Sequence, residues 1–255
     1  MAGYALITGA SSGIGYETAL KFAAKGQNVI IVARNEEKLQ QLKDAIAAQY
    51  PNVDVVIKVV DLAQANNVKA LYEDVKHYSL QTLVNNAGFG DFGSVKDADI
   101  NKIQTMLHLN IEALTILTTL FVKDYENVEG TQVINISSVG GYEIYTAALT
   151  YSATKYYVAA YTEGLDVQLR DKGANMRAKV IAPSSTKTSF MDRSLDTEDT
   201  DYDAYFDRYN TSEELADYIM TLYDSDKHIG IVDDDTLELK LYDHFYPVNT
   251  FGADQ

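Results

Sequence analysis

A tyrosine and a lysine four residues apart are the first residue types in this sequence that could carry out chemistry together. Tyr151 and Lys155 are predicted to lie on one face of a helix. A phenol has an ordinary pKa of about 10, which is too high for efficient proton exchange at neutral pH. A neighbouring ammonium favours the phenolate and lowers that pKa, so we expect Tyr151 to act as a general acid–base.

The spacing alone does not select this pair. Two further pairs share it, Tyr72 with Lys76 and Tyr223 with Lys227. Only Tyr151 has a serine thirteen residues upstream, and this Ser138 follows an apolar predicted strand. Ligands of open parallel sheets bind beyond the carboxyl ends of the strands. We therefore interpret the other two pairs as ordinary surface helix pairs.

A glycine-rich turn joins the first predicted strand to the first predicted helix. It reads Thr8-Gly9-Ala10-Ser11-Ser12-Gly13-Ile14-Gly15. Glycine tolerates positive φ and lets the backbone approach a pyrophosphate, while the helix N-terminus offers free N–H groups to that anion. The turn also contains G-x-S-x-G, the nucleophile elbow of α/β-hydrolases. That alternative fails because the hydrolase oxyanion hole needs an earlier strand, and only eight residues precede Gly9.

The end of the second predicted strand indicates which dinucleotide would bind. An NAD site usually carries a carboxylate there, which binds the ribose 2′-OH. Here Arg34 follows the strand, and the first acid is Glu36. A guanidinium suits a bidentate contact with a 2′-phosphate. We therefore predict NADP(H) as the preferred cofactor, with NAD(H) as the alternative.

Taken together, these motifs resemble those of a short-chain dehydrogenase/reductase of the single-domain type. They occur in the family's order and spacing over about residues 4–190, and they include Asn85-Asn86-Ala87-Gly88, which matches the NNAG motif. Ser184 departs from the family, which usually has glycine there. The resemblance implies that the cofactor contacts Gly9, Ser11, Ser12, Gly13, Ile14, Gly15, Arg34, Asp61, Leu62, Asn86, Ala87, Gly88, Tyr151, Lys155, Pro183 and Thr188.

The resemblance also implies a mechanism of carbonyl reduction. Tyr151 would donate a proton to the carbonyl oxygen as hydride arrives from the nicotinamide. Lys155 would lower the phenol pKa and hydrogen-bond the nicotinamide ribose, Ser138 would hold the substrate oxygen, and Asn110 would fix a water in the proton relay. The alternatives are an NAD(H)-dependent alcohol dehydrogenase of the same family and a dinucleotide-sensing regulator without turnover. Sensors of this kind typically lose the Tyr–Lys pair, which weighs against the second.

These side chains must be positioned by an alternation of strands and helices. Strands are predicted at 4–8, 28–33, 53–60, 82–85, 132–137, 177–182 and 237–241, and helices at 13–25, 36–50, 65–78, 100–124, 151–171 and 212–223. Such alternation predicts an α/β fold, a doubly wound parallel β-sheet of the Rossmann type with helices on both faces. We expect a single domain over residues 1–255, with the cofactor part at about 1–140 and the catalytic helix and substrate lid at about 141–255.

The polar and aromatic segment after Ser184 falls where the family has its substrate lid. We predict a substrate pocket walled by Tyr142, Tyr145 and some of the rings that follow, and hence a hydrophobic or aromatic carbonyl substrate. The candidate rings of the lid are Tyr202, Tyr205, Phe206 and Tyr209.

Composition narrows the class of protein further. The net charge is −16, and residues 191–255 carry 4 bases and 18 acids. This charge argues against nucleic acid or an anionic membrane as a partner and against anionic substrates. With no cysteine and no paired histidines we expect no metal site. We also expect no membrane-spanning run and no signal peptide, hence a cytoplasmic protein. A homodimer or homotetramer is expected by family analogy, through helices 100–124 and 151–171.

Overall fold

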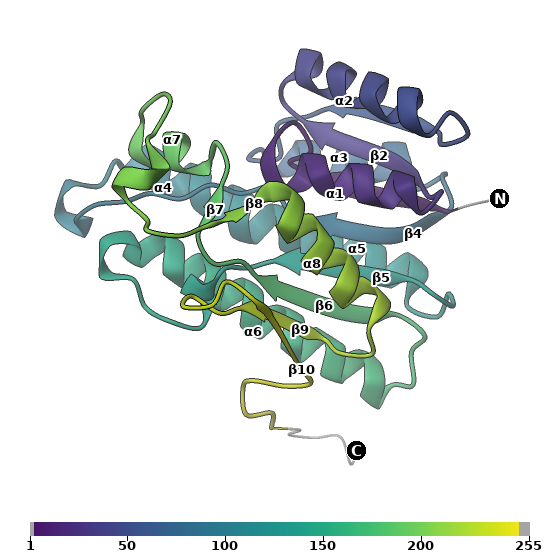
Figure 1. Ribbon diagram of the computed structural model, residues 1–255. Coiled ribbons are helices and arrows are strands. Elements are labelled where there is room, and N and C mark those ends of the chain that lie inside the picture. The colour runs from purple at the N-terminus through teal and green to yellow at the C-terminus, as the bar shows by residue number, and fades with distance from the viewer. Residues whose placement is uncertain (1–2, 250–255) are drawn as a thin grey trace.

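An eight-stranded sheet in the order β10-β9-β6-β5-β4-β1-β2-β3 crosses the computed structural model, which describes residues 3–249 (Figure 1). All neighbouring strands are parallel except β10, which runs antiparallel to β9. This confirms the predicted doubly wound sheet. The strands are β1 Tyr4–Thr8, β2 Asn28–Ala33, β3 Val55–Val59, β4 Leu80–Asn85, β5 Gln132–Ile136, β6 Arg177–Ala182, β9 Ile229–Val232 and β10 Leu239–Tyr242.

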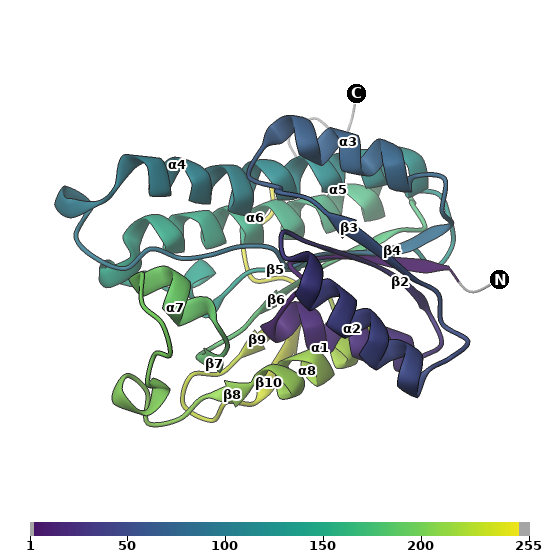
Figure 2. The same cartoon turned by 90° about the horizontal axis from the view of Figure 1, so that it is seen from above.

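Helices cover both faces of the sheet, as Figure 2 shows from above. On one face lie α1 (Gly13–Ala24), α2 (Glu36–Gln49) and α8 (Ser212–Asp224), and on the other α3 (Ala65–Val75), α5 (Leu114–Tyr125) and α6 (Leu149–Asp171). Each layer has its own apolar core, with Phe22 buried in the first and Phe121 in the second. Because both faces are covered, the central strands are apolar nearly throughout.

The long helix predicted at 100–124 is divided into three parts. α4 (Ile100–Leu107) leads into one turn of π-helix (His108–Ala113) and then into α5. π-turns inside helices often lie at functional sites, and this one contains Asn110. Over Ile100–Tyr125 the helix is long and apolar enough to cross a membrane, contrary to our expectation of no such run. In the fold, however, Leu117 and Phe121 are buried in the core against the sheet.

The sequence did not predict β9, which pairs with β6 and extends the sheet. It predicted a substrate lid after Ser184 but no helix or strand within it. The lid, residues 186–211, begins and ends in the short parallel pair β7 (Thr186–Lys187) and β8 (Asn210–Thr211) and contains α7 (Phe190–Leu195). A capping box of Thr211 and Glu214 starts α8 at residue 212, where the sequence predicted a helix to begin.

The interpretation of Tyr72 as a surface residue is wrong. Its side chain is fully buried, and its phenol donates a hydrogen bond to Asp124 at 2.8 Å. Tyr223 is half-buried, with its ring edge-on to that of Phe22. Tyrosine combines a large apolar ring with one polar group, and here α3 uses the ring to fill the second core.

Candidate active site

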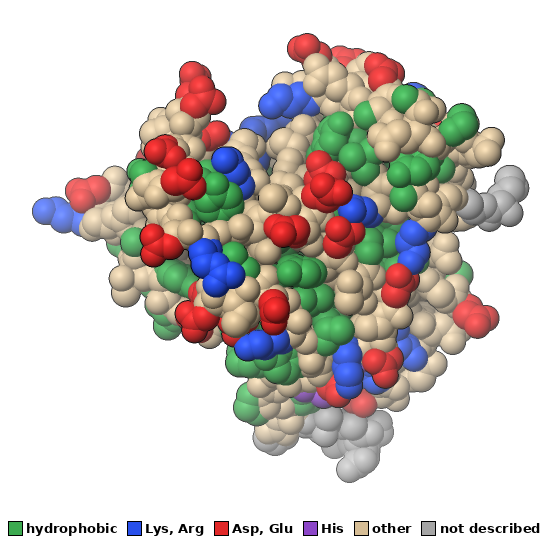
Figure 3. Space-filling view, in the orientation of Figure 1, with side chains coloured by type: hydrophobic (Ala, Val, Ile, Leu, Met, Phe, Trp, Pro, Cys, Tyr) green, Lys and Arg blue, Asp and Glu red, His purple; other side chains and the backbone are tan. Residues whose placement is uncertain are grey.

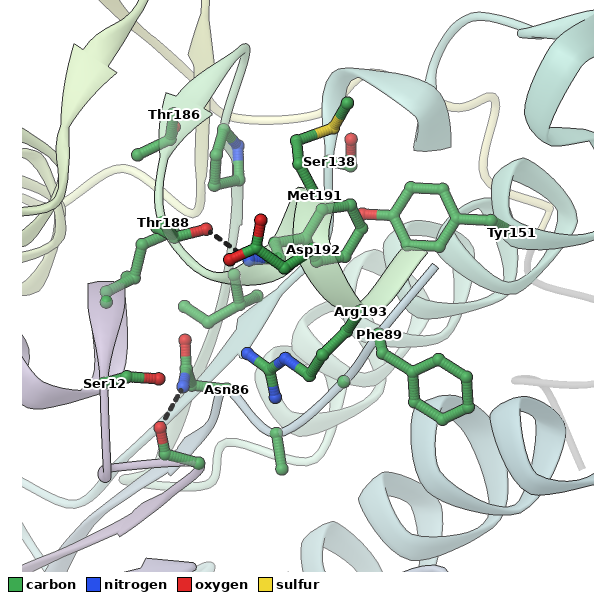
Figure 4. A pocket seen from close by; sticks show the side chains of 18 of the residues that line it. Ser12, Asn86, Phe89, Ser138, Tyr151, Thr186, Thr188, Met191, Asp192 and Arg193 are labelled. Carbon is green, nitrogen blue, oxygen red and sulfur yellow. Dashed lines mark hydrogen bonds between the residues drawn. The ribbon is translucent and has the colours of Figure 1, made fainter. Parts of the chain in front are cut away.

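A cavity of about 1270 Å³ opens along the carboxyl ends of the parallel strands, the side on which open α/β sheets bind ligands. One end is lined by the glycine turn after β1 and by Arg34 after β2. The other end is lined by Ser138 after β5, by Tyr151 and by the lid. Figure 4 shows Ser12 and Asn86 on one side of this cavity and Tyr151 and Ser138 on the other.

The glycine turn has the backbone shape that its composition predicted. Gly9 and Gly13 adopt positive φ angles of 69° and 59°. Residues other than glycine rarely adopt this backbone conformation. A Cβ atom at Gly15 would lie 2.5 Å from the carbonyl oxygen of Gly9, so glycine is needed there for close packing. The turn therefore places the N-terminus of α1 against the cavity.

A network of hydrogen bonds holds the turn against the end of β4. The Thr8 hydroxyl accepts hydrogen bonds from the backbone N–H groups of Asn86 and Ala87, both at 3.0 Å. The Asn86 amide in turn donates to the carbonyl oxygen of Thr8 at 2.9 Å. These bonds join the glycine turn after β1 to the segment that follows β4.

The predicted cofactor residues are brought together almost completely. Arg34 is exposed at the end of β2, and Asp61 accepts a hydrogen bond from the Ala63 N–H at 3.1 Å at the end of β3. Gly15 is the one member of the predicted set that does not line the cavity; it packs behind the turn. The cavity is lined by Gly9, Ser11, Ser12, Gly13, Ile14, Arg34, Asp61, Leu62, Asn86, Ala87, Gly88, Tyr151, Lys155, Pro183 and Thr188.

Ser138, Tyr151 and Lys155 meet at the inner end of the cavity. The Lys155 ammonium is buried and lies 5.7 Å from the centre of the Tyr151 ring. It donates one hydrogen bond, to the carbonyl oxygen of Ile136 at 2.8 Å. An ammonium has three N–H donors, so two remain for the cavity. The Ser138 hydroxyl accepts a hydrogen bond from the Gly140 N–H at 3.1 Å, which orients it.

Burial dominates the protonation of this pair. It raises the pKa of the Tyr151 phenol to about 12, and the hydrogen bond to Ser138 only partly opposes the rise. It also lowers the pKa of the Lys155 ammonium to about 8. In this arrangement the pKa of the phenol is therefore raised and not lowered as expected, because desolvation is the largest cause of the shift. At neutral pH Tyr151 holds its proton and Lys155 its charge.

Asn110 lies behind the cavity wall and does not line the cavity. It is 2% exposed, and its amide donates to the carbonyl oxygen of Phe89 at 2.9 Å while its carbonyl accepts from the Phe89 N–H at 3.2 Å. A further bond reaches the Thr154 hydroxyl at 3.1 Å. Asn110 thus joins the loop after β4 to the catalytic helix α6. Its role in a proton relay stays a prediction of the resemblance.

The two tyrosines predicted to wall the substrate pocket point to different places. Tyr145 lines the cavity, and its phenol donates to Asp234 at 2.7 Å. Tyr142 does not line it, and that prediction is wrong. Its phenol donates to the buried Glu163 at 2.9 Å, and its ring stacks on Tyr246 with centroids 5.5 Å apart. Phe245 and Tyr246 thus pack against the Tyr142 ring.

Several cavity residues of the lid were missed by sequence reasoning. Phe190 lies against Tyr151 with ring centroids 5.3 Å apart, and Arg193 points into the cavity in Figure 4. Tyr202, Tyr205 and Phe206 line the cavity as proposed, whereas Tyr209 packs behind Tyr202. The sequence predicts no helix between residues 171 and 212, so it did not place Phe190 and Arg193 on the cavity side of α7.

The far end of α7 is tied to the body of the protein by Lys102 of α4. The Lys102 ammonium lies 2.8 Å from a carboxylate oxygen of Asp196 and 3.1 Å from one of Asp91. It also donates to the carbonyl oxygen of Ser194 at 3.3 Å. The lid is therefore anchored on its outer side, next to α4 (Figure 2).

The residues present fit a nicotinamide dinucleotide. A positive-φ glycine turn, a free helix N-terminus and Arg34 offer donors and positive charge at one end of the cavity. Within residues 3–249, no three His, Asp or Glu side chains lie close enough together to hold a metal ion.

The fold and this site define an oxidoreductase that uses a nicotinamide dinucleotide. The chain belongs to the short-chain dehydrogenase family, whose sequence model matches residues 3–199. The dehydrogenase/reductase SDR family member 11 of Gallus gallus is 29% identical over 238 residues, which cover 90% of this chain and 93% of the relative.

Solved structures agree with the family. A short-chain dehydrogenase from Sphingobium yanoikuyae in complex with NADPH is 26% identical with a TM-score of 0.82, covering 90% of this chain and 87% of that one. A bulky-bulky ketone specific alcohol dehydrogenase from Comamonas testosteroni is also 26% identical, with a TM-score of 0.77 and coverage of 90% and 85%.

Proposed function

We propose that the protein reduces an uncharged, hydrophobic or aromatic ketone or aldehyde to an alcohol, with NADP(H) as its cofactor. One observation carries the proposal. The half-buried Tyr151, with its proton held, meets Ser138 and the buried Lys155 ammonium at one end of a cavity whose other end presents Arg34. A proton donor is what the carbonyl oxygen needs during reduction.

When bound, the dinucleotide would supply the hydride. Tyr151 would donate its phenol proton to the substrate oxygen, and the Ser138 hydroxyl would hold that oxygen. The Lys155 ammonium would stabilise the phenolate left behind, because its two remaining N–H donors and its charge lie on the same side of α6 as the ring. The phenol then regains a proton from solvent.

The lining of the outer cavity supports the substrate class. Aromatic rings of Phe89, Phe92, Tyr145, Phe190 and Tyr202 line the cavity, and that of Phe190 lies against Tyr151. Figure 3 shows acidic side chains gathered over the lid. Besides Asp61 after β3, the carboxylates that line the cavity belong to Asp192, Asp196, Asp207, Asp234 and Asp235. An anionic substrate would be repelled by this field. The ketone-specific relative from Comamonas testosteroni supports a bulky carbonyl compound.

The test follows NADPH oxidation with two matched ketones, acetophenone and 4-acetylbenzoate, which differ only in a carboxylate. We expect turnover of acetophenone with kcat/KM roughly tenfold or more above that of the anionic partner, and a smaller difference at high salt. Equal or better reduction of the anion contradicts the substrate class.

The same assay separates the alternatives. Dinucleotide binding without turnover of any carbonyl compound would indicate the sensor. NADH preferred over NADPH, with no loss of NADPH affinity in Arg34→Ala, would indicate the NAD(H)-dependent dehydrogenase. A homodimer or homotetramer stays a prediction of the resemblance, and a cytoplasmic location stays a prediction from the sequence.

A further inference from the structure

Two arginines face the phosphate end of the cavity from opposite sides. Arg34 stands at the end of β2, and Arg193 comes from α7 of the lid. Both arginine side chains are exposed to solvent. The charge of Arg34 still acts on Arg193, since partial desolvation and this neighbouring cation both lower the pKa of the Arg193 guanidinium. Two like charges held near each other cost free energy unless an anion lies between them.

Neither arginine has a carboxylate partner within residues 3–249, although the chain has 37 acids against 21 bases. Asp192, the neighbour of Arg193, is instead engaged by the Thr200 N–H at 2.8 Å. Arg170 pairs with Asp166, whereas Arg177 and Arg208 donate, like Arg193, to backbone carbonyl oxygens. What distinguishes Arg34 and Arg193 is that they line one cavity close enough for the charge of one to act on the other.

Arg193 is positioned over the glycine turn. Its guanidinium donates to the Ser189 carbonyl oxygen at 3.2 Å and to the Ser189 hydroxyl at 3.3 Å. The Ser189 hydroxyl lies 3.3 Å from that of Ser12, in the turn itself. Figure 4 shows the Arg193 side chain in the cavity between Asn86 and Phe89. The guanidinium is therefore fixed at one edge and has further N–H donors free.

We propose that Arg193 of the lid binds a phosphate group of the dinucleotide. The bound phosphate would then link the lid to the glycine turn. The proposal rests on the proposed use of a nicotinamide dinucleotide. A phosphate between Arg34 and Arg193 removes their repulsion and takes charge-assisted hydrogen bonds from both. Because Lys102 anchors the outer end of α7, this contact would close the inner end over the cavity.

The phosphate could be the pyrophosphate or the 2′-phosphate, and the contact of Ser189 with Ser12 favours the pyrophosphate. The test measures Kd by titration calorimetry, without substrate, for NADPH, NADH and ADP-ribose. Arg193→Met is compared with Lys187→Met, which removes one positive charge from an exposed lid position outside the cavity.

We expect Arg193→Met to weaken NADPH binding roughly tenfold to hundredfold, as for loss of a charge-assisted hydrogen bond, and Lys187→Met to change it less than threefold, about the scale of an exposed charge. If Arg193→Met weakens the binding of NADH and ADP-ribose as much as that of NADPH, the contact is to the pyrophosphate. If it weakens the binding of NADPH alone, the contact is to the 2′-phosphate. Hydrogen exchange supplies a second readout, because NADPH should protect residues 188–195 in the unaltered protein and less in Arg193→Met.

Unchanged Kd values for all three ligands in Arg193→Met, with tight binding by the unaltered protein, would overturn the role of Arg193 and leave the proposed function intact. An unaltered protein that binds neither NADPH nor NADH would overturn both.

Discussion

Two buried lysines in this protein have the same pKa shift and different surroundings. Burial lowers the pKa of both Lys155 and Lys179 to about 8. Lys179, in β6, donates three hydrogen bonds to the end of α8, at the carbonyl oxygens of Leu222, Tyr223 and Ser225, with distances of 2.8, 2.9 and 2.8 Å. Lys155 donates only one within the described part of the chain, to the carbonyl oxygen of Ile136.

The difference separates structure from function better than the pKa does. An ammonium has three N–H donors. At Lys179 all three are used, so the charge stabilises the carbonyl end of a helix, where the dipole favours a cation. At Lys155 two donors are left facing a cavity. Unused hydrogen-bonding capacity, and not burial alone, marks the group that would meet a ligand.

The largest effect is expected from changes at the catalytic pair. Tyr151→Phe should lower kcat by about 10²–10⁴-fold, because it removes the proton donor. Lys155→Met should lower kcat by a similar factor, because the phenolate loses its cation. Both should keep a melting temperature close to that of the unaltered protein, measured by calorimetry, and Tyr151→Phe should also bind NADPH nearly unchanged. Turnover that survives Tyr151→Phe would remove it from the mechanism.

Lys179→Met should show the opposite pattern. It leaves the Ser225 carbonyl oxygen without its ammonium partner, so the free energy of unfolding should fall by about 1–3 kcal/mol in a urea titration. The kcat per folded molecule should stay the same, since Lys179 does not line the cavity. A loss of kcat with full stability would contradict the distinction drawn between the two lysines.

The smallest effect is a pH dependence that only one of the lysines should produce. The lowered pKa of Lys155 means that it is charged below and neutral above about pH 8, whereas Tyr151 keeps its proton up to about pH 12. Reductive kcat should therefore fall, by up to about tenfold per pH unit, as pH rises through 8. Lys155→Arg, which keeps its charge, should move the fall to higher pH. Lys179→Met should leave the profile unchanged, and a displaced profile there would contradict the assignment.

Local patterns predicted most of the fold. The alternation of apolar strands and helices, the glycine turn and the capping box of α8 depend on neighbouring residues alone, and the structure contains them. β9 was missed because its four residues acquire strand structure by pairing with β6. The π-turn at Asn110 was missed because its helical periodicity differs little from that of an α-helix.

Distant contacts decided the rest of the site. Tyr142 and Tyr145 are the same residue type and lie three positions apart. Tyr142 hydrogen-bonds Glu163 and stacks on Tyr246, and these contacts hold its ring outside the cavity. Arg193 has no local motif; only the packing of α7 brings it near Arg34.

The sequence by itself determined the family, the parallel sheet and the residue types Ser138, Tyr151 and Lys155, because short-range periodicity and motif spacing encode them. Only the tertiary structure decided which tyrosine faces the cavity, which buried lysine keeps free donors and in which direction the phenol pKa moves. Those properties depend on desolvation and on partners far along the chain, and both arise only when the elements pack.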